Sequence, residues 1–144
     1  MYRIVGDHLQ VLLVHLGGPF WRKKDAGAWV IPRGEINENE DLLAAAQREF
    51  GEETGFASHG PYLALGEVRQ SSGKRIHVWA FAGDCDPSQL RSNTFEIEWP
   101  PKSGKRRAFP EVDRAEFFSL AEGMVKIMKA ETAFLERLAE AVGV

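Results

Sequence analysis

The chain has 144 residues, of which 44% are hydrophobic and 27% charged, so we expect one globular domain over residues 1–144. The formal net charge of −3 provides no positive field for long nucleic acids, which we exclude as partners. The single cysteine, Cys85, cannot form an intramolecular disulfide. No apolar run approaches the ~18 residues of a membrane span, and the N-terminus lacks the features of a signal peptide. We therefore expect a cytoplasmic protein that does not enter membranes.

Short strand patterns alternate along the chain with two helical patterns. The first residues have the pattern of a strand, a turn and a second, apolar strand. A polar turn at residues 70–74 separates two later strand patterns and predicts a hairpin. This order predicts an α/β (α+β) fold with a mixed sheet sandwiched between helices. The expected elements after the first strand are a strand at 9–16, a loop at 20–33, a helix at 40–53, strands at 62–69, 75–82 and 95–99, a basic loop at 100–110 and one helix at 120–142.

The first predicted helix carries three carboxylates close together. Glu49, Glu52 and Glu53 have the spacing i, i+3 and i+4, which places them on one helical face. They repel one another, and they lie near the helix C-terminus, where the macrodipole disfavours anions. A bound divalent cation would reverse this cost, and carboxylate oxygens suit Mg²⁺ or Mn²⁺. The alternative is an ordinary acidic face exposed to solvent.

The spacing of the fixed residues around these glutamates favours the cation. The segment Gly34–Phe56 resembles the Nudix box. In this pattern five residues separate a glycine from a glutamate, and seven further residues separate the glutamate from an Arg-Glu pair. An apolar residue, any residue, a Glu-Glu pair, any residue, a glycine and a final apolar residue follow. No position of this segment departs from that pattern. The matching residues are Gly34, Glu40, Arg48, Glu49, Phe50, Glu52, Glu53, Gly55 and Phe56.

The resemblance implies roles for the residues of the box. Glu49 and Glu53 would bind Mg²⁺ (or Mn²⁺) directly, and Glu52 directly or through water. The carbonyl of Gly34 would be a further ligand. Glu49 or Glu52 would orient or deprotonate the attacking water. Arg48 would pair with a box glutamate and fix its conformation, while Glu40 would hold the loop through hydrogen bonds or an ion pair.

Residues outside the box are harder to interpret. Glu111 is our candidate for a base outside the box, with a solvated loop acid as the alternative. Trp29 to Gly34 resembles the approach segment of dinucleoside polyphosphate and diphosphoinositol polyphosphate hydrolases, with Arg33 in place of lysine. We expect Arg33 to bind phosphate. Lys105 and Arg106, in the basic loop, are candidates for further phosphates, with a solvated turn as the alternative. The candidates for stacking on a base are Trp29, Trp79 and Trp99, with simple packing as the alternative.

The resemblance implies a metal-dependent hydrolase that cuts a phosphoanhydride bond in a nucleoside diphosphate linked to another group. The expected partner is a small nucleotide polyphosphate, either a dinucleoside polyphosphate or a nucleoside triphosphate, and the protein would be a monomer or homodimer. Three alternatives stay open: an enzyme for nucleotide sugars, a Nudix-fold sensor that binds without cleaving, and an interaction domain with an incidental acidic helix.

Overall fold

The computed structural model describes residues 1–33 and 39–143, and the architecture is α+β. Helices α1, α2 and α3 accompany eight strands and two short 3₁₀ turns. In chain order the elements are β1 (Tyr2–Val5), β2 (His8–Leu16), β3 (Trp29–Val30), α1 (Leu42–Thr54), β4 (Leu63–Arg69), β5 (Arg75–Ala80), η1 (Pro87–Gln89), β6 (Thr94–Glu98), β7 (Arg106–Pro110), β8 (Val112–Ser119), α2 (Leu120–Lys126), η2 (Lys129–Glu131) and α3 (Thr132–Val142).

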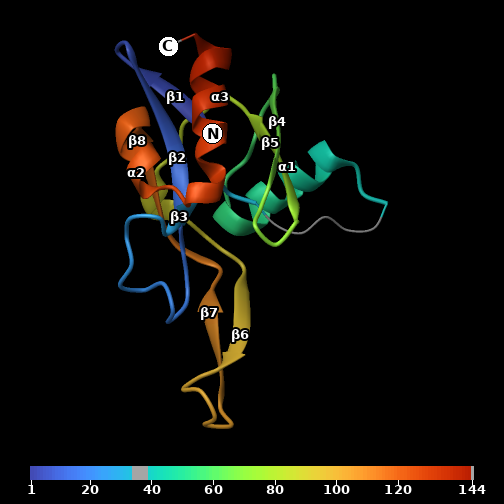
Figure 1. Cartoon of the computed structure of the whole chain (residues 1–144), viewed down its shortest axis with the longest axis vertical. Coiled ribbons are helices and arrows are strands. Elements are labelled where there is room, and N and C mark those ends of the chain that lie inside the picture. Colours follow the sequence, from blue (N-terminus) through green and yellow to red (C-terminus); the bar gives the residue numbers. More distant parts are fainter. Residues whose placement is uncertain (34–38, 144) are drawn as a thin grey trace.

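Strand β2 is the centre of the molecule, because it pairs antiparallel with β1, β3 and β8. Its side chains alternate between two faces, as a buried strand requires. Leu9, Val11 and Leu13 face the core beneath α3, whereas Leu12 and Val14 face a second core that includes Phe50 of α1. Helices therefore cover both faces of the sheet, with α1 on one side and α2 and α3 on the other (Figure 1). The predicted helix–sheet–helix arrangement is confirmed.

The box helix α1 begins and ends with ordinary capping chemistry. Asp41 is the N-cap, and its carboxylate accepts a hydrogen bond from the backbone N–H of Ala44 at 3.1 Å. Gly55 ends the helix in the left-handed conformation, with φ +75°. The prediction of a helix at 40–53 is therefore displaced by only one or two residues, and the box glutamates occupy its last two turns.

The C-terminal prediction of a single helix at 120–142 is wrong. Helix α2 ends at Lys126, and the next residues are extended before η2 and α3 begin. Ile127 forms a parallel bridge to Trp29, and the N–H of Met128 donates to the carbonyl of Trp29 at 2.7 Å. Pairing with β3 thus competes with helix propagation and places Ile127 in the core at 2% exposure.

The strand predicted at 95–99 is confirmed as β6, but the predicted basic loop at 100–110 contains β7, which forms an antiparallel hairpin with β6 and is followed by β8. Strands β6 and β7 pair from Thr94↔Pro110 to Glu98↔Arg106, so the loop predicted at 100–110 is half strand. This hairpin projects away from the rest of the chain (Figure 1). Strand β8, which the sequence did not reveal, pairs with β2 over seven positions. Among the described residues, no helix is long and apolar enough to span a membrane.

Candidate active site

The three box glutamates differ in their exposure to solvent. Helix α1 turns Glu53 inward, where it is buried at 6% exposure, while the side chain of Glu49 is 13% exposed and that of Glu52 is 41% exposed. The helical spacing therefore produces a graded acidic turn that runs from the protein interior to the surface. Such a gradient allows one carboxylate to be fixed by the fold and another to meet solvent.

Arg48 holds the outer part of this turn together. Its guanidinium donates two hydrogen bonds to Glu40, at 2.8 and 2.9 Å, in the bidentate geometry that fits a carboxylate. The same guanidinium donates to Glu49 at 2.8 Å and to Glu52 at 3.0 Å. The predicted pairing of Arg48 with box glutamates and the ion pair of Glu40 are confirmed. The single guanidinium of Arg48 thus pairs with three carboxylates.

Glu53 is the most perturbed acid of the turn. Its carboxylate accepts a short hydrogen bond, 2.6 Å, from the backbone N–H of Arg33. Burial raises the pKa of Glu53 to about 8, the Arg33 hydrogen bond opposes this rise, and the charges of Glu111 and Glu49 add to it. Burial therefore favours the protonated form of Glu53 at neutral pH, and a positive charge bound beside this carboxyl group would favour the ionised form.

Glu111 lies beside the box, although it is distant in sequence. Its backbone N–H donates to the carbonyl of Asn93 at 2.8 Å, and the N–H of Asn93 donates to the carbonyl of Glu52 at 3.0 Å. Its own carbonyl accepts from Gly17 at 2.9 Å. The structure thus brings our candidate outside the box to the C-terminal turn of α1, close enough for its charge to act on Glu53.

The donor chemistry of this turn fits a divalent cation. Glu49, Glu52, Glu53 and Glu111 offer hard carboxylate oxygens, and a bound cation would favour the ionised form of Glu53, whose pKa burial raises. Within the described part of the chain, no three acidic, histidine or cysteine side chains yet converge on one point. The physical reason is that Arg48 holds Glu49 and Glu52 along its own guanidinium. Gly34, our predicted carbonyl ligand, lies outside the described residues.

The guanidinium of Arg33, our predicted phosphate ligand, forms an ion pair with an acid of the C-terminal region. Its guanidinium donates to Glu131 at 3.0 and 3.3 Å, and Glu131 is completely buried. The other carboxylate oxygen of Glu131 accepts from the N–H of Ile31 at 3.2 Å. The side chain of Arg33 therefore braces the approach segment against η2, while its backbone serves Glu53. Sequence reasoning missed Glu131 because nothing near it in the chain marks a buried acid.

Two other predicted substrate contacts lie away from the acidic turn. Trp29 is 1% exposed, packs against His15 and Phe118, and donates its indole N–H to Asp25 at 2.9 Å. Its ring offers no free face to a base, so packing, the alternative we considered, describes it. Lys105 and Arg106 lie on the projecting hairpin rather than beside α1 (Figure 1).

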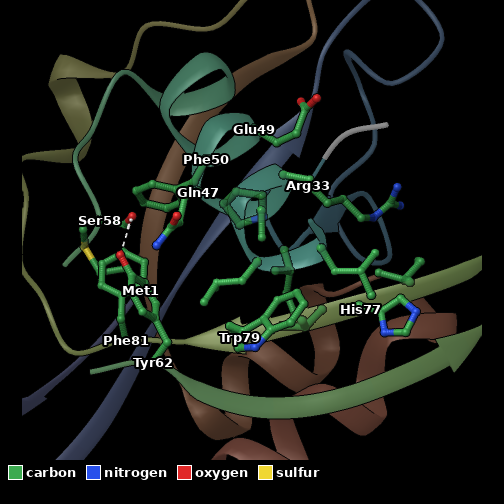
Figure 2. A pocket seen from close by; sticks show the side chains of 18 of the residues that line it. Met1, Arg33, Gln47, Glu49, Phe50, Ser58, Tyr62, His77, Trp79 and Phe81 are labelled. Carbon is green, nitrogen blue, oxygen red and sulfur yellow. Dashed lines mark hydrogen bonds between the residues drawn. The ribbon is translucent and has the colours of Figure 1, made fainter. Parts of the chain in front are cut away.

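A cavity of about 390 Å³ opens beside Glu49, between α1 and the β4–β5 hairpin. Figure 2 shows Trp79 and His77 on the strand side and Gln47, from α1, pointing into the space. Tyr62 closes one end, with its hydroxyl 3.0 Å from that of Ser58, and Arg33 lies toward the other end near Glu49. Aromatic walls with a few polar groups are the usual composition of a site for a nucleobase. The alternating pattern of β5 was the one available signal for these residues.

These features define a class of protein in which a helix presents clustered carboxylates beside a nucleotide-sized cavity. The NUDIX domain model matches residues 1–138, so the chain belongs to the Nudix family.

Curated relatives match shorter stretches. An uncharacterized 17.7 kDa protein of Enterobacteria phage T4 is 36% identical over 92 residues, which are 61% of this chain and 59% of that protein. An RNA pyrophosphohydrolase of Caulobacter vibrioides is 42% identical over 53 residues, 33% of this chain and 31% of the relative. The chain therefore spans less than two thirds of the length of either relative.

Solved structures match along nearly the whole chain. A C. elegans Ap4A hydrolase binary complex has a TM-score of 0.67 at 16% identity and covers 99% of this chain and 93% of its own. The NUDIX domain of Shewanella oneidensis NrtR, complexed with ADP ribose, has a TM-score of 0.66 at 19% identity and covers 98% and 82%. A MutT protein from Methanosarcina mazei has a TM-score of 0.59 at 20% identity, with 99% and 93% covered. At these identities the likeness supports the fold alone.

Proposed function

We propose that this protein hydrolyses a phosphoanhydride bond of a nucleoside polyphosphate, either a dinucleoside polyphosphate or a nucleoside triphosphate, with Mg²⁺ or Mn²⁺ at the box glutamates. The single observation that carries the proposal is the acidic turn of α1, where Glu49, Glu52 and Glu53 are brought together on one helical face and close to Glu111. The nucleotide-sized cavity next to Glu49 supports the same assignment. The names of the Ap4A hydrolase and of the RNA pyrophosphohydrolase agree with a polyphosphate substrate.

The residues of the turn would divide the work according to their exposure. Glu53 is fixed by the Arg33 N–H, so it would anchor the site. Glu52 is the most exposed of the three and would orient or deprotonate the attacking water, with Glu49 as the alternative base. A divalent cation held among these oxygens would neutralise phosphate charge and favour attack by water at neutral pH. Arg48 would keep Glu49 and Glu52 in register.

The cavity would hold the nucleoside. Trp79 provides a large ring for stacking, and the Gln47 amide can donate to and accept from the edge of a base. Glu49 lies at the rim of this cavity, so a base bound inside would place the first phosphates next to the acidic turn. This arrangement requires no contact from Trp29.

The test is a substrate panel with the full chain at millimolar Mg²⁺. We would incubate dinucleoside tetraphosphates, nucleoside triphosphates and nucleotide sugars, and identify the products by mass. Release of mononucleotide or inorganic phosphates, abolished by a chelator, supports the proposal. Glu52→Gln should lower kcat by about 10²–10⁴-fold. The matched control is Glu140→Gln on α3, an exposed glutamate far from the turn, which should keep wild-type activity.

Two other outcomes would change the assignment. Turnover confined to nucleotide sugars would favour the runner-up enzyme within the family. Tight nucleotide binding with no turnover, in the wild type as in Glu52→Gln, would favour a Nudix-fold sensor and contradict the hydrolase.

A further inference from the structure

One surface outside the acidic turn combines basic and aromatic side chains. It is formed by two segments, residues 17–27 and residues 94–110, which we call the platform. Together these segments contain seven basic and three acidic side chains, a formal net charge of +4 in a chain whose total is −3. Although the whole chain has a net negative charge, positive charge is therefore concentrated on the platform.

The two segments of the platform pack closely against each other. Gly17 and Gly18 make this approach possible: a Cβ on Gly17 would meet the Pro110 carbonyl oxygen at 2.1 Å, and one on Gly18 would meet Phe95 at 2.9 Å. Phe20 then contacts Trp99 edge to face, with ring centroids 5.5 Å apart. The platform is thus a defined surface rather than two independent loops.

Two aromatic rings of the platform are largely or partly exposed to solvent, where they contribute little to the stability of the fold. Phe20 is 62% exposed, and Trp99 beside it is only partly covered. Lys102, Lys105 and Arg107 on the hairpin, and Arg22 and Lys23 on the other segment, are exposed, and no ion pair is recorded for them within the described residues. Exposed rings flanked by unneutralised cations are the composition that binds a nucleobase together with phosphate.

The platform is attached directly to the acidic turn. The N–H of Arg91 donates to the carbonyl of Thr54 at 2.9 Å, and that of Asn93 donates to the carbonyl of Glu52 at 3.0 Å, so the segment that leads directly into β6 is hydrogen-bonded to the end of α1. The outgoing strand leads straight to Glu111. Five-residue strands extend the hairpin by about 17 Å beyond this point. A substrate long enough to pass the carboxylates would next meet the platform.

We propose that the platform binds a second nucleotide unit of an extended substrate, on the far side of the phosphates cleaved at the acidic turn; this rests on the function proposed above. Phe20 and Trp99 would stack on the second base, while Lys102 and Arg107 would bind the connecting phosphates. The second unit has two sources with the same chemistry: the distal nucleoside of a dinucleoside polyphosphate, or the following nucleotide of a 5′-triphosphorylated RNA.

The first experiment measures kcat and KM of the full chain for three substrates: a dinucleoside tetraphosphate, a short 5′-triphosphorylated RNA and a nucleoside triphosphate. Phe20→Ala should raise KM for the extended substrates about tenfold relative to the mononucleotide, since one stacked base is lost. The matched control is Val125→Ala, an apolar side chain of similar exposure, 64%, on α2. A selective effect on the tetraphosphate or on the RNA identifies the source, and either supports the proposal.

The second experiment removes charge instead of stacking. Lys102→Ala/Arg107→Ala should weaken the salt dependence of KM for the extended substrates, because fewer phosphate contacts are formed. Arg69→Ala/Lys129→Ala is the control, with one exposed lysine and one exposed arginine outside the platform. The proposal would be overturned if the salt dependence of KM changed equally in both double variants. It would also be overturned if Phe20→Ala and Val125→Ala gave the same ratio of KM for the extended substrates to KM for the mononucleotide. Either result would leave the hydrolase assignment intact.

Two outcomes separate this proposal from the other possibilities. If the chain hydrolyses none of the substrates, the proposed function fails. The same compounds are then used as ligands in equilibrium binding measurements. Tryptophan fluorescence then shows whether Phe20→Ala weakens binding of the extended compounds about tenfold, which would still support the platform. If sedimentation shows a wild-type dimer that Phe20→Ala dissociates, the platform is an interface between copies and the proposal is wrong.

Discussion

Two arginine–glutamate clusters flank the approach to α1, and they differ in how charge is balanced. Arg33 pairs with one acid, Glu131, which is completely buried. Arg48 is shared among Glu40, Glu49 and Glu52, and a further carboxyl group, that of Glu53, lies close by. In the first pair one cation matches one buried anion, so we assign this pair to stability. The unbalanced cluster has negative charge left over, which is what a cation site requires.

The largest expected effect concerns the balanced pair. Glu131→Ala leaves the guanidinium of Arg33 and the N–H of Ile31 without their partner, so we expect it to lower the free energy of unfolding by about 3–5 kcal/mol. Chemical denaturation measures this change. Glu136→Ala, at an exposed position of α3, should cost far less. If the two variants lost the same free energy of unfolding, the Arg33–Glu131 pair would have no special role in stability, and the distinction between the two clusters would be wrong.

A smaller effect is expected for the unbalanced cluster. Arg48→Lys keeps the charge but loses the planar fork that contacts three glutamates at once, so kcat/KM should fall by about 10–100-fold. The free energy of unfolding should change by less than in Glu131→Ala. An Arg48→Lys protein that unfolds easily yet keeps its specific activity would show that this cluster, too, is purely structural.

A third prediction concerns nucleotide binding in the cavity beside Glu49. Trp79→Ala removes the proposed stacking surface, so KM for a nucleotide should rise about tenfold while kcat changes little. Because Trp79 is not among the proposed cation ligands, cation binding should be unaffected. A fall in kcat with no change in KM would place the nucleoside elsewhere.

The smallest effect is a pH dependence of stability in the metal-free protein. Burial raises the pKa of Glu53 to about 8 in the folded chain, above its ordinary value of 4.5. Between these values the folded protein binds more protons than the unfolded one, so this group lowers stability as pH rises through the window. Glu53→Gln should therefore raise Tm at pH 8 and flatten its decline from pH 5. An unchanged pH profile in Glu53→Gln would mean that the carboxylate is not buried as described.

The parts of the molecule that sequence could predict are those governed by local periodicity. The helix α1, its three aligned glutamates and the pairing of Arg48 all follow from spacing within two turns. The Arg33–Glu131 pair joins residues 98 positions apart, and no local pattern marks it. The same holds for the burial of Trp29 and for the break after Lys126, because both depend on pairing between β3 and Ile127. Strand β8 was missed because its polar residues interrupt the apolar alternation that marks a half-buried strand.

The most direct measurement is calorimetric titration of the metal-free full chain with Mn²⁺ and Mg²⁺ at neutral pH. The account predicts saturable uptake by the wild type and by Glu140→Gln, with affinity at least about tenfold weaker in Glu49→Gln/Glu53→Gln. Absence of uptake at millimolar Mg²⁺, or identical uptake by the double variant, would contradict the assignment of the acidic turn as a cation site.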